Sequence, residues 1–170
     1  MGIAYLESRD LFENSDDALK AEGCTTGGVM QVTSSLRDST CHPDQHTFVN
    51  TEQDIRFNVK CGVTHFYGLL SWQTKQEDRL NELIEKEVKG DSGDDTTWRV
   101  VAAVQWYTGA PYYDGMLDPH KRDYLQTMAH KVRHVIPRDY PEYASQTQWA
   151  SLLEKGHLAV AKYYKEKSGG

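Results

Sequence analysis

Residues 97–107 read TWRVVAAVQWY and contain the most apolar run of the chain, VVAAV at residues 100–104. Thr96 precedes the segment as a candidate helix N-cap, and the sequence Gly-Ala-Pro at residues 109–111 follows it as a stop signal. An apolar run between such signals is typical of a helix that is covered on all sides. We therefore expect residues 97–107 to form a buried helix around which the other elements pack.

Apolar residues at a spacing of three to four predict further helices on both sides of this segment. The expected helices span residues 51–70, 75–89, about 119–136 and about 145–165, with another helical segment at residues 3–20. A break is expected at residues 90–95, and residues 22–46 are expected to form a long glycine-containing loop. No Asn-Gly or Asp-Gly turn lies between sustained alternating runs, so little sheet is expected. The predicted fold class is mainly α, a bundle of about six helices.

The size and charge of the chain narrow the classes of protein to consider. Its 170 residues, 38% hydrophobic and 26% charged, suit a single domain at 1–170. A net charge of −6 makes nucleic acid and anionic membrane surfaces poor partners. The N-terminal residues have neither the basic region nor the apolar region of a signal peptide. Since helical spacing starts at once, we expect a domain that belongs to a larger protein.

The spacings of the cysteines and of three histidines in the first half of the chain do not predict a metal site. The cysteines are Cys24, Cys41 and Cys61, with no C-x-x-C pair and with separations that fit no zinc motif. We expect ordinary thiols, with a Cys24–Cys41 disulfide as the alternative. His42, His46 and His65 are also too far apart in sequence for a tight ligand motif, so they are expected to be surface histidines.

Four short segments occur in a characteristic order. They are LES at 6–8, GVMQV at 28–32, DIRFNVKCGV at 54–63 with YGLL at 67–70, and AAVQWYTG at 102–109 followed by RDYL at 122–125. This succession resembles the lysozyme-like superfamily of goose-type lysozymes and lytic transglycosylases. That family has a Glu-Ser pair, then Gly-Leu-Met-Gln-Val/Ile, Asn-Ile-x-x-Gly-x-x-Tyr-Leu, Ala-Tyr-Asn-Ala-Gly and a late Tyr-Val.

The resemblance covers about residues 4–135, with three departures. Val29 stands where the family has Leu. Trp106-Tyr107 stands where the family has Tyr-Asn, so the usual Asn is missing. The residues before Tyr124 lack the family's frequent Glu-Thr. The resemblance implies a lysozyme-like helical domain whose cleft is lined by the glycine-containing loop, at residues 22–33.

The implied activity is cleavage of peptidoglycan at the β-1,4 bond between N-acetylmuramic acid and N-acetylglucosamine. Glu7 is the expected general acid, because glycosidic cleavage needs a carboxylic acid that stays protonated near neutral pH, and apolar neighbours raise a Glu pKa in this way. Glu22 lies six positions before Gly28, where the goose-type branch has an acidic residue, and is the candidate base or water-positioning group. If neither Glu22 nor another carboxylate serves, the sugar's C6 hydroxyl attacks, as in a lytic transglycosylase that leaves 1,6-anhydro products.

The resemblance also implies the substrate-binding residues, which are Ser8, Gly28, Met30, Gln31, Trp106, Tyr107 and Tyr124. No cofactor or metal is needed. The expected partner is peptidoglycan, with a cognate immunity or inhibitor protein as a second one. The expected place of action is the bacterial cell wall, in the periplasm of a target cell or outside the cell, reached as part of a larger effector or phage protein.

Two other classes of function remain open at this point. A catalytically silent module would keep the sugar-binding groove without the chemistry, and the missing Asn favours this alternative. A peptidoglycan peptidase would use Cys24 as nucleophile with His46 or His65 as base. Release of glycan fragments from purified wall separates the first alternative from the lysozyme prediction, and thiol alkylation separates the second.

Overall fold

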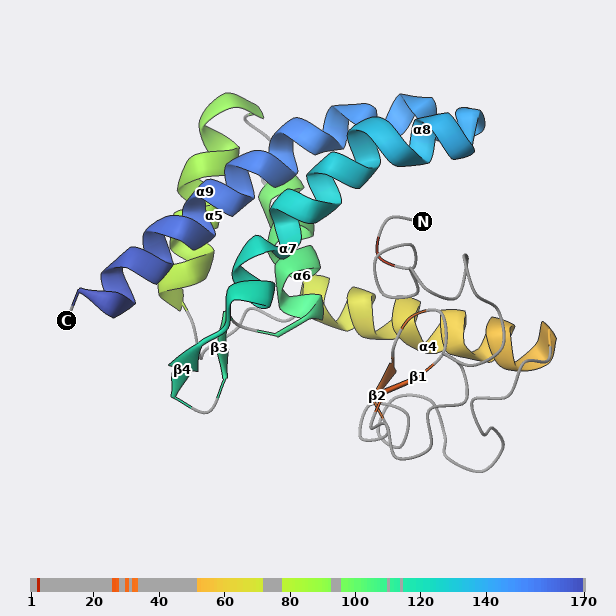
Figure 1. Cartoon of the computed structure of the whole chain (residues 1–170), viewed down its shortest axis with the longest axis horizontal. Helices are drawn as coiled ribbons and strands as arrows, with labels where there is room; N and C mark the ends of the chain where they lie inside the picture. Colours follow the sequence, from red (N-terminus) through yellow and green to blue (C-terminus); the bar gives the residue numbers. More distant parts are fainter. Residues whose placement is uncertain are drawn as a thin grey trace. The chain divides into compact units, whose positions relative to one another are not determined.

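The described part of the chain is mainly α-helical, which confirms the mainly-α class expected from the sequence. The computed structural model describes residues 52–71, 78–92, 96–109, 111–113 and 115–169, together with residues 3, 26, 27, 30, 32 and 33. The chain divides into two units, Met1–Gly68 and Leu69–Gly170. Figure 1 shows the elements of both.

The first unit contains the long helix α4, Glu52–Ser71, up to Gly68, and the bounds of the helix lie within one residue of the prediction. It also contains two short antiparallel strands, β1 (Thr26–Gly27) and β2 (Val32–Thr33), in which Thr26 pairs with Thr33 and Gly27 with Val32. The sequence did not predict these strands, because a two-residue strand is too short to show alternation. Met30 lies between these two strands in the sequence.

The second unit is helical along most of its length. Its helices are α5 (Asp78–Ser92), α6 (Thr97–Tyr107), α7 (Pro119–His130), α8 (Ile136–Asp139) and α9 (Gln148–Ser168). A π-helical turn, η2 (Lys131–Val135), joins α7 to α8, and a 3-10 segment, η3 (Pro141–Thr147), precedes α9. Within the described ranges, no helix is both long and apolar enough to cross a membrane.

Two details of these helices correct the sequence predictions. Helix α5 continues through Gly90 to Ser92, so the predicted break at residues 90–95 begins too early. Helix α6 has the predicted bounds, but Thr96 has helical backbone angles and its side chain makes no capping hydrogen bond. The bounds of α6 were therefore right although the predicted cap was wrong.

A small hairpin leads into α7. Strands β3 (Tyr112–Tyr113) and β4 (Met116–Leu117) pair antiparallel, and Gly115 between them has a φ of +81°. The sequence there is Asp114-Gly115, a strong two-residue hairpin signal that the prediction passed over because no alternating runs flank it. Asp118 then caps α7 by accepting a hydrogen bond from the His120 amide at 3.0 Å.

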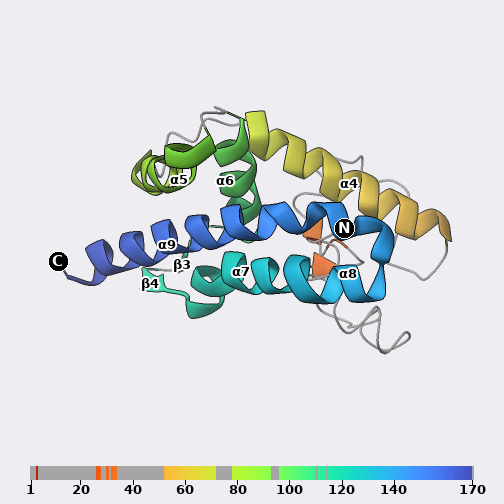
Figure 2. The same ribbon diagram turned by 90° about the horizontal axis from the view of Figure 1, so that it is seen from above.

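The core of the second unit forms where α9 crosses its neighbours. Figure 2 shows α9 running between α5 and α6 on one side and α7 on the other. The helices meet through side chains that are fully buried, which include Leu80, Ile84, Val88, Val101, Leu125, Val160 and Tyr163. Residues 101–104 of α6 are buried as predicted.

Gly156 allows α9 to approach both α6 and α7. A Cβ atom built on Gly156 would lie 2.4 Å from Cγ1 of Val101 and 2.9 Å from Cδ1 of Leu125. Both distances are shorter than carbon atoms tolerate, so a side chain at this position would push the helices apart. The missing side chain is therefore a packing requirement of the second unit.

We expect Gly156→Ala to lower the free energy of unfolding by about 1–3 kcal/mol, because the added methyl group overpacks the contact with Val101 and Leu125. Gly90→Ala is the matched control: Gly90 is helical, and nothing lies within 4 Å of the position that its added methyl group would take. This control should raise stability by about 0.5–1 kcal/mol. Urea unfolding of both variants is the measurement, and equal shifts in the two would contradict the packing argument.

Candidate functional site

The backbone of Met30 is fixed on helix α4. Its amide donates a hydrogen bond of 2.7 Å to Oδ1 of Asn58, and both residues are buried. A buried amide with a side-chain acceptor is held much more firmly than one that faces water, because breaking the bond leaves two polar groups unsatisfied. The second and third of the four sequence segments therefore meet at this hydrogen bond.

Gly62 lies one turn after Asn58 on the same face of α4, and Met30 packs directly on it. A Cβ atom at Gly62 would lie 2.6 Å from Cβ of Met30 and 2.7 Å from both its Cγ and Cε. Only glycine allows this approach. Asn58 and Gly62 thus act together, since one holds the Met30 backbone and the other makes room for its side chain.

Cys61, next to Gly62, corrects the cysteine prediction. It is almost fully buried and forms a disulfide bond, so the expectation of an ordinary thiol is wrong for this residue. The other two cysteines, Cys24 and Cys41, lie outside the described residues. The spacing of the three cysteines could not identify the bond, because disulfide pairing depends on folded geometry. The disulfide is thus a covalent cross-link to α4 at the residue next to Gly62.

His65 also differs from its prediction, since it is partly buried on α4 instead of fully on the surface. Burial lowers the pKa of its imidazole below the usual value, because the charged form is less well solvated.

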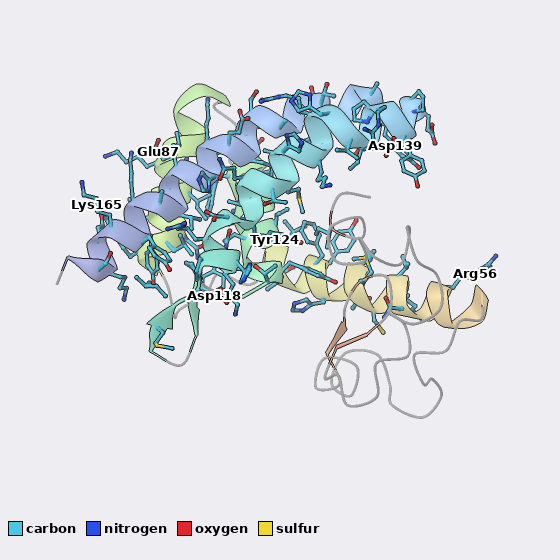
Figure 3. The ribbon with its side chains drawn as sticks, viewed as in Figure 1. Arg56, Glu87, Asp118, Tyr124, Asp139 and Lys165 are labelled. Atoms are coloured by element: carbon cyan, nitrogen blue, oxygen red, sulfur yellow. The ribbon has the colours of Figure 1, made fainter. Side chains whose placement is uncertain are left out.

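The aromatic residues predicted for the substrate lie in the second unit. Trp106 and Tyr107 end helix α6, and Tyr124 lies on α7, where Figure 3 labels it. All three side chains are partly buried. The indole Nε1 of Trp106 donates a hydrogen bond of 2.9 Å to Oδ1 of Asn81 on α5. This bond fixes the indole ring against α5, a structural role that the sequence did not predict.

Gln105, beside Trp106, is a polar residue of the core that the sequence analysis missed. Its side chain is fully buried, and its Nε2 donates a hydrogen bond of 2.7 Å to the carbonyl oxygen of Lys121. Among the residues that the structure describes, none makes a hydrogen bond to its Oε1. The amide ties the end of α6 to the start of α7. No sequence signal pointed to it, because a glutamine after an apolar run resembles the start of an exposed face.

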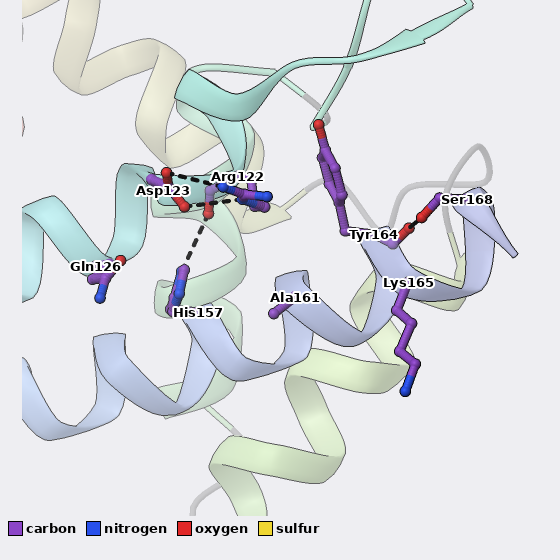
Figure 4. Close-up of a pocket in the computed structure, with 8 residues that line it drawn as sticks. All are labelled: Arg122, Asp123, Gln126, His157, Ala161, Tyr164, Lys165 and Ser168. Atoms are coloured by element: carbon purple, nitrogen blue, oxygen red, sulfur yellow. Dashed lines mark hydrogen bonds and ion pairs between the residues drawn. The ribbon is translucent and has the colours of Figure 1, made fainter.

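A pocket of about 540 Å³ lies along α7 and α9 in the second unit (Figure 4). Its one carboxylate, Asp123, is ion-paired with Arg122 at 3.0 Å, and this pairing raises the pKa of Arg122. The guanidinium also lies 5.0 Å from the ring centre of Tyr164. None of the residues predicted to bind the glycan lines this pocket.

The structure describes four of the nine predicted site residues, namely Met30, Trp106, Tyr107 and Tyr124. Glu7, Ser8, Glu22, Gly28 and Gln31 lie outside the described residues. No family model, curated protein or solved structure matches the chain. The geometry around Met30 is therefore the structural observation that bears most directly on function.

We expect Asn58→Ala to lower the free energy of unfolding by about 1–3 kcal/mol, because it leaves the buried Met30 amide without an acceptor. Lys60→Ala is the control, since Lys60 is exposed on the same helix. Hydrogen exchange at the Met30 amide should also become faster in Asn58→Ala alone. An unchanged exchange rate would show that the hydrogen bond does not hold the backbone of Met30.

Proposed function

We propose that this chain cleaves the glycan strand of peptidoglycan at the β-1,4 bond between N-acetylmuramic acid and N-acetylglucosamine. The observation that carries the proposal is the attachment of Met30 to α4 through Asn58 and Gly62. Two of the segments that resemble the lysozyme-like superfamily are in contact there, through the Met of one and the Asn and Gly of the other. This contact supports the proposal because it joins two of the segments that carry the resemblance.

The proposal includes a lysozyme-like fold for the helical chain. In this fold the segment at residues 28–32 borders the substrate groove, and Met30 anchors it to α4. A rigid anchor suits this role, because glycosidic cleavage requires the sugar to be held in a fixed position relative to the acid. The resemblance also assigns Trp106, Tyr107 and Tyr124 to saccharide binding, to which aromatic rings are suited.

The proposed chemistry uses Glu7 as general acid. Its carboxyl proton passes to the glycosidic oxygen as the bond to the anomeric carbon breaks, and the departing sugar leaves with a hydroxyl group. Glu22 then takes a proton from a water molecule that attacks the anomeric carbon, which gives a free reducing end. In the transglycosylase alternative the C6 hydroxyl of the same sugar attacks the anomeric carbon instead, gives up its proton to the Glu7 carboxylate formed in the first step, and closes a 1,6-anhydro ring.

The disulfide at Cys61 supports the proposed place of action. Disulfides persist in oxidising compartments such as the periplasm and the extracellular space, where peptidoglycan is also found. We therefore propose that the chain acts on the bacterial wall after delivery, with a cognate immunity or inhibitor protein as its partner in the producing cell.

We expect Glu7→Gln to reduce the release of soluble fragments from purified peptidoglycan by ~10²-fold or more, because the amide cannot donate the required proton. Glu142→Gln is the matched control, since Glu142 is exposed on η3. Both variants should have the same midpoint of urea unfolding as the wild type. If a folded Glu7→Gln variant releases fragments at the wild-type rate, the proposed catalytic acid is wrong, and if the wild type releases none, the silent binding module replaces the enzyme.

Glu22→Gln distinguishes the two chemistries. In a hydrolase that uses Glu22, the rate should fall strongly and the wild-type products should carry free reducing ends. Mass spectrometry of the released muropeptides makes this comparison, because an anhydro product lacks one water. Anhydro products alone, with a fully active Glu22→Gln variant, would instead establish a transglycosylase with Glu7 as its acid.

A further inference from the structure

Two histidines face each other near the end of α7. The rings of His130 and His134 have their centres 5.1 Å apart and are inclined by 50°. Both side chains are exposed. Within the described part of the chain, neither imidazole makes a hydrogen bond or an ion pair. Both ring nitrogens of each imidazole are therefore accessible to a ligand from solution.

The separation of the rings matches that of two imidazoles bound to one metal ion. A metal ion about 2.1 Å from one nitrogen of each ring, at a tetrahedral angle, places the two ring centres about 5 Å apart. Residues four apart project from adjacent turns of a helix, so both imidazoles reach the same side. The observed separation of 5.1 Å between the ring centres therefore fits two imidazoles that share one metal ion.

The backbone and the nearby charges are also compatible with such a site. His134 lies within the π-helical turn η2, and π-helical turns often occur at functional positions. The cationic side chain next to it, Arg133, is turned to Glu154 on α9, with Nη2 and Oε2 2.9 Å apart. The hydrogen bond from Arg133 is the main cause that lowers the pKa of the Glu154 carboxyl group, and His134 adds a smaller electrostatic contribution. This carboxylate partly offsets the positive charge of Arg133.

We propose that His130 and His134 form a two-ligand site for a divalent transition-metal ion such as Zn²⁺, Ni²⁺ or Cu²⁺. Imidazole is a preferred ligand of all three ions. In the described ranges, no group of three or more His, Cys, Asp or Glu residues could hold a metal. Water or an external ligand therefore fills the remaining coordination positions. The site is independent of the proposed glycan cleavage and uses none of its residues.

Calorimetric titration of the full chain, without an affinity tag, with NiCl₂ tests this site. We expect one ion per chain at this position, and a loss of affinity of about tenfold or more in both His130→Ala and His134→Ala, because each variant removes one of two ligands. His120→Ala is the matched control, since His120 is exposed on the same helix and should leave the affinity unchanged.

The unfolding temperature in the presence of Ni²⁺ is a second measurement, which separates binding at this site from binding at other histidines. Ni²⁺ should raise the unfolding temperature of the wild type and of His120→Ala but not that of His134→Ala, because an ion that binds only the folded state stabilises it. Circular dichroism checks that the exposed substitutions leave the helices intact. Equal Ni²⁺ affinity in the wild type and His134→Ala, or an equal loss in His120→Ala, would overturn the proposal.

Discussion

The hydrogen bond from the Met30 amide to Asn58 is the interaction on which the functional account depends. It fixes one backbone position of the glycine-containing segment on a long helix. Gly62 makes that attachment possible, because any larger residue would occupy the space of the Met30 side chain. The disulfide at Cys61 adds a covalent restraint beside the same contact. Asn58 and Gly62 thus hold Met30 on α4, through its backbone and its side chain respectively.

In the second unit, too, a glycine that permits close packing occurs together with a buried side-chain hydrogen bond. Gly156 lets α9 pack closely on Val101 and Leu125, and the buried amide of Gln105 ties α6 to the start of α7. Close helix packing and a satisfied buried donor both rigidify the unit. Its surface ion pairs, such as Arg79 with Glu166 between α5 and α9, add little because they are exposed to water.

The helices were predictable from sequence because apolar spacing and stop signals act locally, as the bounds of α4 and α6 illustrate. The short strands and the long-range contacts could not be predicted from the sequence in this way. The Asp114-Gly115 hairpin has no alternating flanks, and the burial of Gln105 depends on a carbonyl of another helix. At the candidate site, the sequence named Met30 but not its hydrogen bond to Asn58, because that contact joins residues far apart along the chain.

The central claim is that the proposed glycan cleavage requires Met30 to stay packed on α4. Measuring cleavage by two glycine variants on this helix tests that claim. Gly62→Ala displaces Met30, whereas Gly68→Ala adds its methyl group where nothing lies within 4 Å. With both proteins shown to be folded by circular dichroism, the account predicts a loss of fragment release from purified peptidoglycan of about 10²-fold in Gly62→Ala, as expected when a positioning element shifts. Gly68→Ala should cleave at the wild-type rate. A folded Gly62→Ala variant that cleaves as fast as Gly68→Ala would contradict the account.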